Sequence, residues 1–160
     1  MEKSIRKNLK KYKKMNFSRV DIIRHFNIWL TAWDEHDLDG VMEFLHEDIV
    51  FENWNGVVVS GKSALQKSWV PWFIHHGNFK FITEDIFIDE QEQKMTFQWR
   101  LEWPSLEKFF KGKREIRRGV DVLHFLDGKI IKKYTYSKTS IQIDSRPVSL
   151  YAPKDDFSLQ

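Results

Sequence analysis

The feature that most constrains this chain is a change in its hydrophobic period along the sequence. Near the N-terminus, apolar residues recur every three or four positions, as on one face of a helix. Farther along, the spacing becomes two, and Lys94–Trp103 alternates apolar and polar residues. Amphipathic helices followed by long alternating strands predict an α+β domain, in which the helices pack on one face of an antiparallel sheet.

Three helices are predicted, and each has a recognisable start. Ser18 is a suitable N-cap for the first helix and Asp37 for a short second one, because their side-chain oxygens accept the unpaired N–H groups of a first turn. The third helix follows Ser60-Gly61 and ends at Gly77. Pro71 lies inside it, and we expect this proline to kink the helix or to end it early.

Two dipeptides predict tight hairpins. Asn55-Gly56 joins the predicted strands Asp48–Trp54 and Val57–Ser60. Asp127-Gly128 joins Arg114–Leu126 to Lys129–Lys138. Both dipeptides are typical of a type I′ turn, which needs a positive φ at two consecutive residues.

The remaining segments complete the predicted sheet and divide the chain. Phe79–Asp89 is expected to pair with Lys94–Trp103, and Pro104–Lys113 forms a long loop with an exposed Phe109-Phe110 pair. After Ile143 the sequence loses its periodicity. We therefore predict a basic N-terminal extension (1–17), one domain (18–143) and a C-terminal tail (144–160).

A strongly twisted sheet of such long strands can curve into a cone around its three helices and enclose a pocket. Aromatic residues make up 15% of the chain, with 13 Phe and 7 Trp. They suit either a compact core or a cavity for a flat, apolar ligand. The residues that we expect to line the cavity are Trp29, Trp33, Trp54, Phe97 and Trp99.

The net charge of +3 comes from the N-terminal segment. Residues 1–19 carry +7, so the remainder carries −4. Such a segment is either a solvated extension or a contact to nucleic acid or anionic lipid, but the domain itself is not expected to bind nucleic acid.

The absence of cysteine excludes disulfides. With no membrane-spanning run and no signal-like apolar segment, a cytoplasmic location is the default expectation.

Motifs for metals and cofactors are not found in the sequence. The six histidines are scattered, and the adjacent His75 and His76 point in different directions on a helix. No phosphate-binding glycine loop, nucleophile elbow or dinucleotide fingerprint is present. We therefore expect no metal and no cofactor.

Three segments resemble the nuclear transport factor 2-like superfamily, and most closely its SnoaL-like branch of polyketide cyclase-like and ketosteroid isomerase-like proteins. They are AWDEHDLDGVMEFLHEDIVFENWNG at residues 32–56, GKSALQKSW at 61–69 and VDVLHFLDGKIIKKYTY at 120–136. The resemblance covers roughly residues 20–140 and implies a cystatin-like α+β barrel. Because this superfamily includes enzymes and proteins without catalysis, the fold does not define the reaction.

The resemblance implies a partial match to the isomerase site. Asp121 stands at the position of the isomerases' acid on the penultimate strand, which donates a hydrogen bond in its protonated form. Trp29 replaces their tyrosine and Asn53 replaces their general base, and an amide cannot abstract a proton. Glu52 would serve as the base only if a bulge turned it inward. Gly119 stands where the epoxide-hydrolase branch has an arginine, so that pattern does not match well.

Two interpretations of Asp121 follow from its neighbours. Arg117 shares its strand face, and Lys133 is expected to face the same interior from the last strand. Asp121 is either an inert partner of one of these cations or a lone acid that faces the ligand. Without a cationic partner it would serve as an acid, and beside one it would stay ionised and serve as a base.

Two functions remain open at this point. In the first, the chain binds a small apolar or aromatic molecule and catalyses a cyclisation, isomerisation or dehydration through Asp121, helped by Asn53 and the Trp29 N–H. The proposed ligand contacts are Trp29, Trp33, Trp54, Phe97, Trp99, Arg117 and Lys133. In the second, the chain is a non-catalytic ligand-binding or protein-interaction module. The resemblance also implies a homodimer formed through the outer sheet face.

Overall fold

The computed structural model describes residues 15–75 and 77–150. Its helices are α2 (Arg19–Asp34), α3 (Leu38–Glu43) and α4 (Lys62–His75). Its strands are β1 (Leu45–Glu52), β2 (Val58–Ser60), β3 (Lys80–Asp89), β4 (Lys94–Pro104), β5 (Arg114–Leu126), β6 (Lys129–Ser137), β7 (Ser140–Ile143) and β8 (Arg146–Ser149). Most of the predicted basic extension lies outside the described residues.

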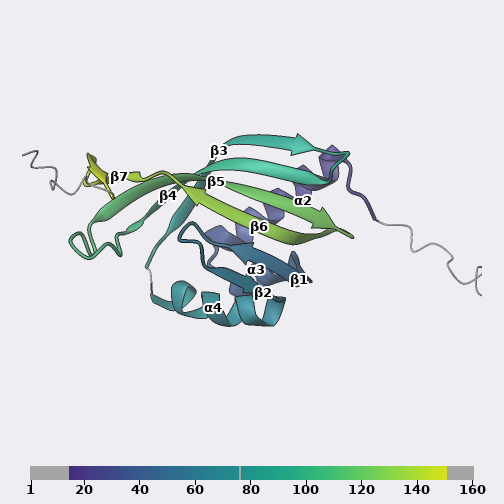
Figure 1. Ribbon diagram of the computed structural model, residues 1–160, viewed down its shortest axis with the longest axis horizontal. Coiled ribbons are helices and arrows are strands. Elements are labelled where there is room, and N and C mark those ends of the chain that lie inside the picture. Colours follow the sequence, from purple (N-terminus) through teal and green to yellow (C-terminus); the bar gives the residue numbers. More distant parts are fainter. Residues whose placement is uncertain (1–14, 76, 151–160) are drawn as a thin grey trace, which may run out of the picture.

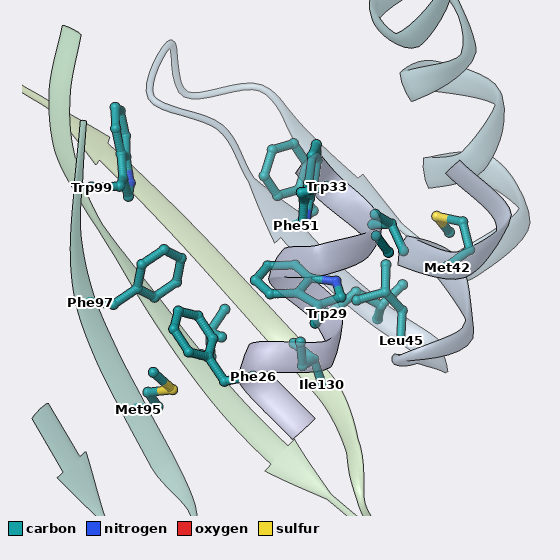
Figure 2. Close-up of a cluster of buried hydrophobic side chains, with 14 of the residues drawn as sticks. Phe26, Trp29, Trp33, Met42, Leu45, Phe51, Met95, Phe97, Trp99 and Ile130 are labelled. Atoms are coloured by element: carbon teal, nitrogen blue, oxygen red, sulfur yellow. The ribbon is translucent and has the colours of Figure 1, made fainter. Parts of the chain in front are cut away.

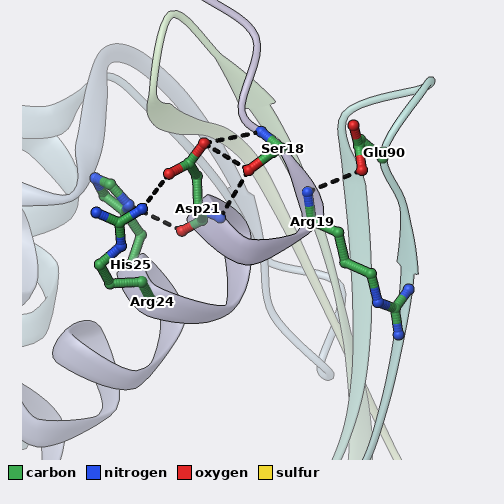
Figure 3. Close-up of polar contacts among 6 residues, drawn as sticks. All are labelled: Ser18, Arg19, Asp21, Arg24, His25 and Glu90. Carbon is green, nitrogen blue, oxygen red and sulfur yellow. Dashed lines mark hydrogen bonds and ion pairs between the residues drawn. The ribbon is translucent and has the colours of Figure 1, made fainter.

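The predicted N-cap of α2 is confirmed. The Ser18 side chain accepts the Asp21 N–H at 3.2 Å, and the Asp21 carboxylate accepts the Ser18 N–H at 3.1 Å, which forms a capping box (Figure 3). The Ser18 hydroxyl, at 2.7 Å, and the Ser18 N–H both donate to the Asp21 carboxylate and lower its pKa, and the charges of Arg24 and His25 add to the effect. The helix start is also tied to the sheet, because the Arg19 N–H donates to Glu90 Oε2 at 2.9 Å.

The sheet is curved and covers the helices, as predicted. Its strand order is β2-β1-β6-β5-β4-β3, and the β7–β8 hairpin joins at β5. The long strands arch over α2, while α4 lies below the β1–β2 hairpin (Figure 1). The sheet is not wholly antiparallel, because β1 pairs with β6 in parallel. This pairing brings the N-terminal hairpin beside the last long strand.

The two predicted type I′ turns have different outcomes. Asp127 and Gly128 both have a positive φ, at 48° and 75°, which agrees with this turn type. In the first hairpin only Gly56 has a positive φ. That turn therefore is not type I′: it spans more residues, and the Gly56 N–H donates to the Asn53 carbonyl. The longer turn places Trp54 and Asn55 beyond the strand end.

Two further expectations are corrected. Helix α4 continues through Pro71 to His75, so Pro71 does not end it early. After Ile143 the chain is not irregular throughout, because Arg146–Ser149 forms β8 and pairs with β7. Two positive-φ residues, Asp144 and Ser145, make a turn that hydrophobic periodicity does not reveal. The domain boundary at residue 143 stays a prediction.

The core lies between α2, α3 and the concave face of the sheet (Figure 2). The alternating residues of β4 all face inward, because Met95, Phe97, Trp99, Leu101 and Trp103 are each at most 6% exposed. Phe97 packs against Phe26 of α2, with ring centroids 4.7 Å apart. The alternation in the sequence therefore predicted the buried face of this strand correctly.

Gly119 makes room for the largest of these side chains. It lies opposite Trp99 on the neighbouring strand. A Cβ at Gly119 would lie 2.3 Å from Trp99 Cζ2 and 2.1 Å from the Tyr136 carbonyl oxygen. The glycine thus allows the indole ring to cross β5.

We expect Gly119→Ala to lower the free energy of unfolding by about 3 kcal/mol, because a methyl group here overpacks the interior against backbone. Urea denaturation followed by circular dichroism measures this loss. Val120→Ala is the matched control, since Val120 lies next along the strand on the other face. A Gly119→Ala protein as stable as the control would contradict the packing described here.

Candidate functional site

A cavity of about 460 Å³ opens between the β1–β2 hairpin with α4 and the concave face of β4, β5 and β6. Its volume lies within the range of small-molecule sites. The lining residues are Trp33, Phe51, Asn53, Trp54, Asn55, Val57, Val59, Ser68, Trp69, Trp72, Phe81, Trp99, Trp103, Leu106, Glu107, Arg117, Asp121, Lys133 and Thr135.

Aromatic rings form most of the apolar wall. The Trp33 ring lies 5.2 Å from that of Trp69 on α4, between ring centroids. On the sheet side, the Trp99 ring lies 6.1 Å from Trp54 and 5.8 Å from Phe81. Rings that pack against one another in this way are held rigidly, and such a wall suits a flat ligand.

A buried ion pair stands in this wall. Asp121 is 4% exposed and Lys133 is 6% exposed. Lys133 Nζ lies 2.5 Å from Asp121 Oδ2, and it donates a hydrogen bond to Thr135 Oγ1 at 2.7 Å. The Trp99 indole N–H donates to the other carboxylate oxygen, Asp121 Oδ1, at 2.9 Å. The carboxylate is therefore held by groups from both neighbouring strands.

The sheet register explains why these side chains meet. Asp121 lies opposite Phe97 on β4 and opposite Thr135 on β6. Lys133 and Trp99 are its diagonal neighbours, two residues along each flanking strand. Long side chains reach across such diagonals. Alternation brings all of these residues to the concave face.

Lys133 changes the interpretation of Asp121. The prediction of a lone acid is wrong, because the ammonium group lies beside the carboxylate. At this distance each group offsets the free-energy cost of burying the other's charge. Of the two interpretations of Asp121 made from the sequence, the structure has the one with a cationic partner, and that partner is Lys133.

A second charged group lies at the loop end of the cavity. Arg117 is 4% exposed, and its Nε donates to Glu115 Oε1 at 2.7 Å. A terminal guanidinium nitrogen donates to Glu107 Oε1, also at 2.7 Å. The guanidinium carbon lies 5.0 Å from the Trp54 ring centroid, which adds a cation–π contact.

The structure brings most of the predicted site residues together. Those in the cavity wall are Asn53, Trp33, Trp54, Trp99, Arg117, Asp121 and Lys133. Trp29 and Phe97 do not line it and belong to the core (Figure 2). The Trp29 Nε1 is buried without a hydrogen-bond partner, so the indole N–H that serves Asp121 comes from Trp99. Glu52 is not among the lining residues, and no bulge turns it inward.

Several lining residues were not predicted. Trp69 and Trp72 lie on α4, where Leu65, Trp69 and Trp72 recur at spacings of four and three residues, and this helical period is a signal for them. Phe81 lies in a predicted strand, and no feature of the sequence there indicated that it would line the cavity. Glu107 lies in the loop between β4 and β5, where no periodicity indicates which side chain points inward.

No histidine of the described residues lines the cavity. His124 faces away from the cavity, and burial lowers its pKa, as do the nearby ammonium groups of Lys94 and Lys132. Across residues 15–75 and 77–150, no three His, Asp or Glu side chains are grouped to hold a metal ion. No helix in the same part of the chain is long and apolar enough to cross a membrane.

Comparison with known proteins identifies the class and then the family. The fold is that of nuclear transport factor 2-like proteins, which have the cystatin-like architecture. The family model described as SnoaL-like domain matches residues 27–133. The chain therefore belongs to the SnoaL-like family. No curated protein sequence matches the chain.

Three similar solved structures illustrate the fold. TerC, crystallised with polyporic acid, is 13% identical, has a TM-score of 0.63 and covers 74% of this chain and 92% of its own. A nuclear transport factor 2-like protein of unknown function from Mesorhizobium loti is 21% identical and has a TM-score of 0.60. The match covers 78% of this chain and 97% of that protein. An LEH-like epoxide hydrolase from M. tuberculosis is 18% identical and has a TM-score of 0.61. The match covers 74% of this chain and 84% of that protein.

We expect Lys133→Met to lower the free energy of unfolding by about 3 kcal/mol, because it leaves the Asp121 carboxylate buried without its cation. Urea denaturation measures this change. In the double variant Asp121→Leu/Lys133→Met both charges are absent, so stability should return to the wild-type value or exceed it. If Lys133→Met alone unfolds at the wild-type urea concentration, the two charges are not coupled as described.

Proposed function

We propose that this SnoaL-like protein binds a flat, apolar or aromatic small molecule in the cavity and abstracts a proton from it through Asp121. The observation that carries the proposal is the Asp121–Lys133 pair in the wall of the aromatic cavity. The co-crystallisation of TerC, a protein of similar fold, with polyporic acid supports small-molecule binding.

The free-energy cost of burying the Asp121–Lys133 pair supports a role for it in catalysis. Removing two charges from water costs several kcal/mol per ion, and an apolar pair of similar volume is often at least as stable. Here the pair lies at a ligand-sized cavity and not in the closed core. Charged groups held in a cleft by specific partners are candidates for catalysis.

The geometry suits proton abstraction next to a carbonyl group. A carboxylate has about four lone-pair sites, and Trp99 and Lys133 occupy two of those on Asp121. A free lone pair takes the proton from carbon, and the electron pair of the broken C–H bond moves to the carbonyl oxygen. Lys133 directs two of its three N–H donors at Asp121 and Thr135, so the third is available to that oxygen.

Asn53 is proposed as a hydrogen-bonding partner in this step. It lines the cavity, and its Oδ1 accepts the Trp54 N–H at 2.8 Å. The Asn53 NH2 group is then the part that can donate to a ligand oxygen. Asn53 therefore orients the ligand and does not move a proton.

Binding without chemistry is the second candidate. Both carboxylate oxygens of Asp121 already accept a partner, which is the arrangement of a satisfied structural pair. In that case the aromatic walls bind the ligand and Asp121 only keeps Lys133 in place. An isotope-exchange experiment separates the two functions.

Assembly and location are proposed from the resemblance. We propose a cytoplasmic homodimer that forms through the outer face of the long strands. Phe87 on β3 and Tyr136 on β6 support this, since each is 56% exposed on that face. Pairing of two copies would cover these aromatic side chains.

The test uses 2-tetralone, a flat two-ring ketone with acidic C–H groups beside its carbonyl. We expect the wild-type protein to speed deuterium uptake from D2O at these carbons, measured by proton NMR. Asp121→Asn should reduce the protein-catalysed rate by about 100-fold or more, because an amide cannot accept the proton.

Asp48→Asn is the matched control for this exchange experiment, because the Asp48 side chain is 88% exposed and far less enclosed than Asp121. It should exchange at the wild-type rate. If 2-tetralone binds but wild type and Asp121→Asn both exchange at the buffer rate, the second candidate, binding without chemistry, is correct.

A further inference from the structure

Arg117 has two carboxylate partners that differ in how firmly they are held. Glu115 is fully buried and lies two residues away on the same strand face. Glu107 comes from the loop between β4 and β5, and its side chain is 39% exposed. One partner is therefore a fixed part of the interior, and the other reaches in from the surface.

The Glu115 partnership is built into the fold. Ser105, which is also fully buried, donates its hydroxyl to Glu115 Oε2 at 2.6 Å. The same hydroxyl accepts the Glu107 N–H at 3.2 Å. Glu115 in turn holds Arg117 Nε. These bonds fix the stem of the arginine and leave its terminal nitrogens at the cavity.

The Glu107 partnership occupies the cavity side of the guanidinium. Both Glu107 and Arg117 line the cavity, and Glu107 Oε1 accepts from a terminal nitrogen of Arg117. The guanidinium carbon also lies 5.0 Å from the Trp54 ring centroid and 5.9 Å from that of Trp103. A planar cation beside two indole rings is a favourable place for an aromatic carboxylate.

We propose that Arg117 binds a ligand carboxylate. In the free protein the Glu107 carboxylate occupies this position on Arg117, and the ligand carboxylate displaces it. Glu115 stays on Arg117 Nε, and exchange of the Glu107 carboxylate for a ligand carboxylate replaces the charge-assisted hydrogen bond at the terminal nitrogen. A neutral ligand offers no such replacement. This inference rests on the proposed function and deepens it, because it defines the substrate class.

The ligand class follows from the positions of the two charged groups. Arg117 and Asp121 are four residues apart on one strand face, about 13 Å between their Cα atoms. Gly119 lies between them without a side chain, and the Trp99 ring covers that position. The site thus fits a flat aromatic acid with its carboxylate at Arg117 and its reactive polar group at the Asp121–Lys133 pair.

The test compares two probes of the same shape in calorimetric titrations. They are 6-hydroxy-2-naphthoate, which is an anion, and 6-hydroxy-2-naphthamide, which is its neutral analogue. In Glu107→Gln the competing charge is removed while the side-chain shape is kept. We expect this variant to bind the carboxylate about tenfold more tightly than wild type does, and to bind the amide as wild type does.

Glu92→Gln is the control for the loss of one negative charge. The Glu92 side chain is 65% exposed in the turn between β3 and β4, and it should change neither affinity. If Glu107→Gln leaves carboxylate binding unchanged, or weakens both probes equally, Glu107 is not a place-holder and the inference is overturned, although the cavity still binds. If neither probe binds to any of the proteins, the proposed function fails as well.

Discussion

The site depends on one buried ion pair, in which Lys133 on β6 lies against Asp121 on β5. Two charges at 4% and 6% exposure are costly to remove from water, so each requires the other. The Trp99 indole N–H and the Thr135 hydroxyl complete the hydrogen bonding from the neighbouring strands. Three central strands must therefore keep their register for the pair to exist, and the polar end of the cavity forms only when they do.

The shape of the cavity depends on the position that has no side chain, Gly119. Gly119 lets the Trp99 ring cross β5, and this places the indole nitrogen at Asp121. The β1–β2 turn extends past the strand ends and brings Trp54 toward the sheet, where its ring lies 6.1 Å from that of Trp99. Residues of the curved sheet and of α4 line the remaining sides. The same packing that fills the core around Trp29 thus leaves an aromatic-walled opening beside it.

Features with a local cause were predictable from the sequence. Ser18 caps a helix because of its own side chain, and Asp127-Gly128 turns because of its own backbone. Alternation also predicted that Asp121 and Lys133 face the interior. It could not tell where along the cone a residue lies, and Trp29 and Phe97 are therefore core residues although they face inward as expected. The parallel β1–β6 pair and the reach of Glu107 from its loop depend on distant contacts, for which one sequence carries no periodic signal.

The most direct test of this account is a crystal structure of the wild-type protein soaked with 2-tetralone. The account predicts the two rings between the walls formed by Trp54, Trp99 and Trp69, with the carbonyl oxygen within hydrogen-bond distance of Lys133 Nζ and an adjacent CH2 group facing Asp121. A probe bound elsewhere on the protein would contradict the central claim that the Asp121–Lys133 pair serves a ligand. So would rings inside the cavity with the carbonyl turned away from the pair.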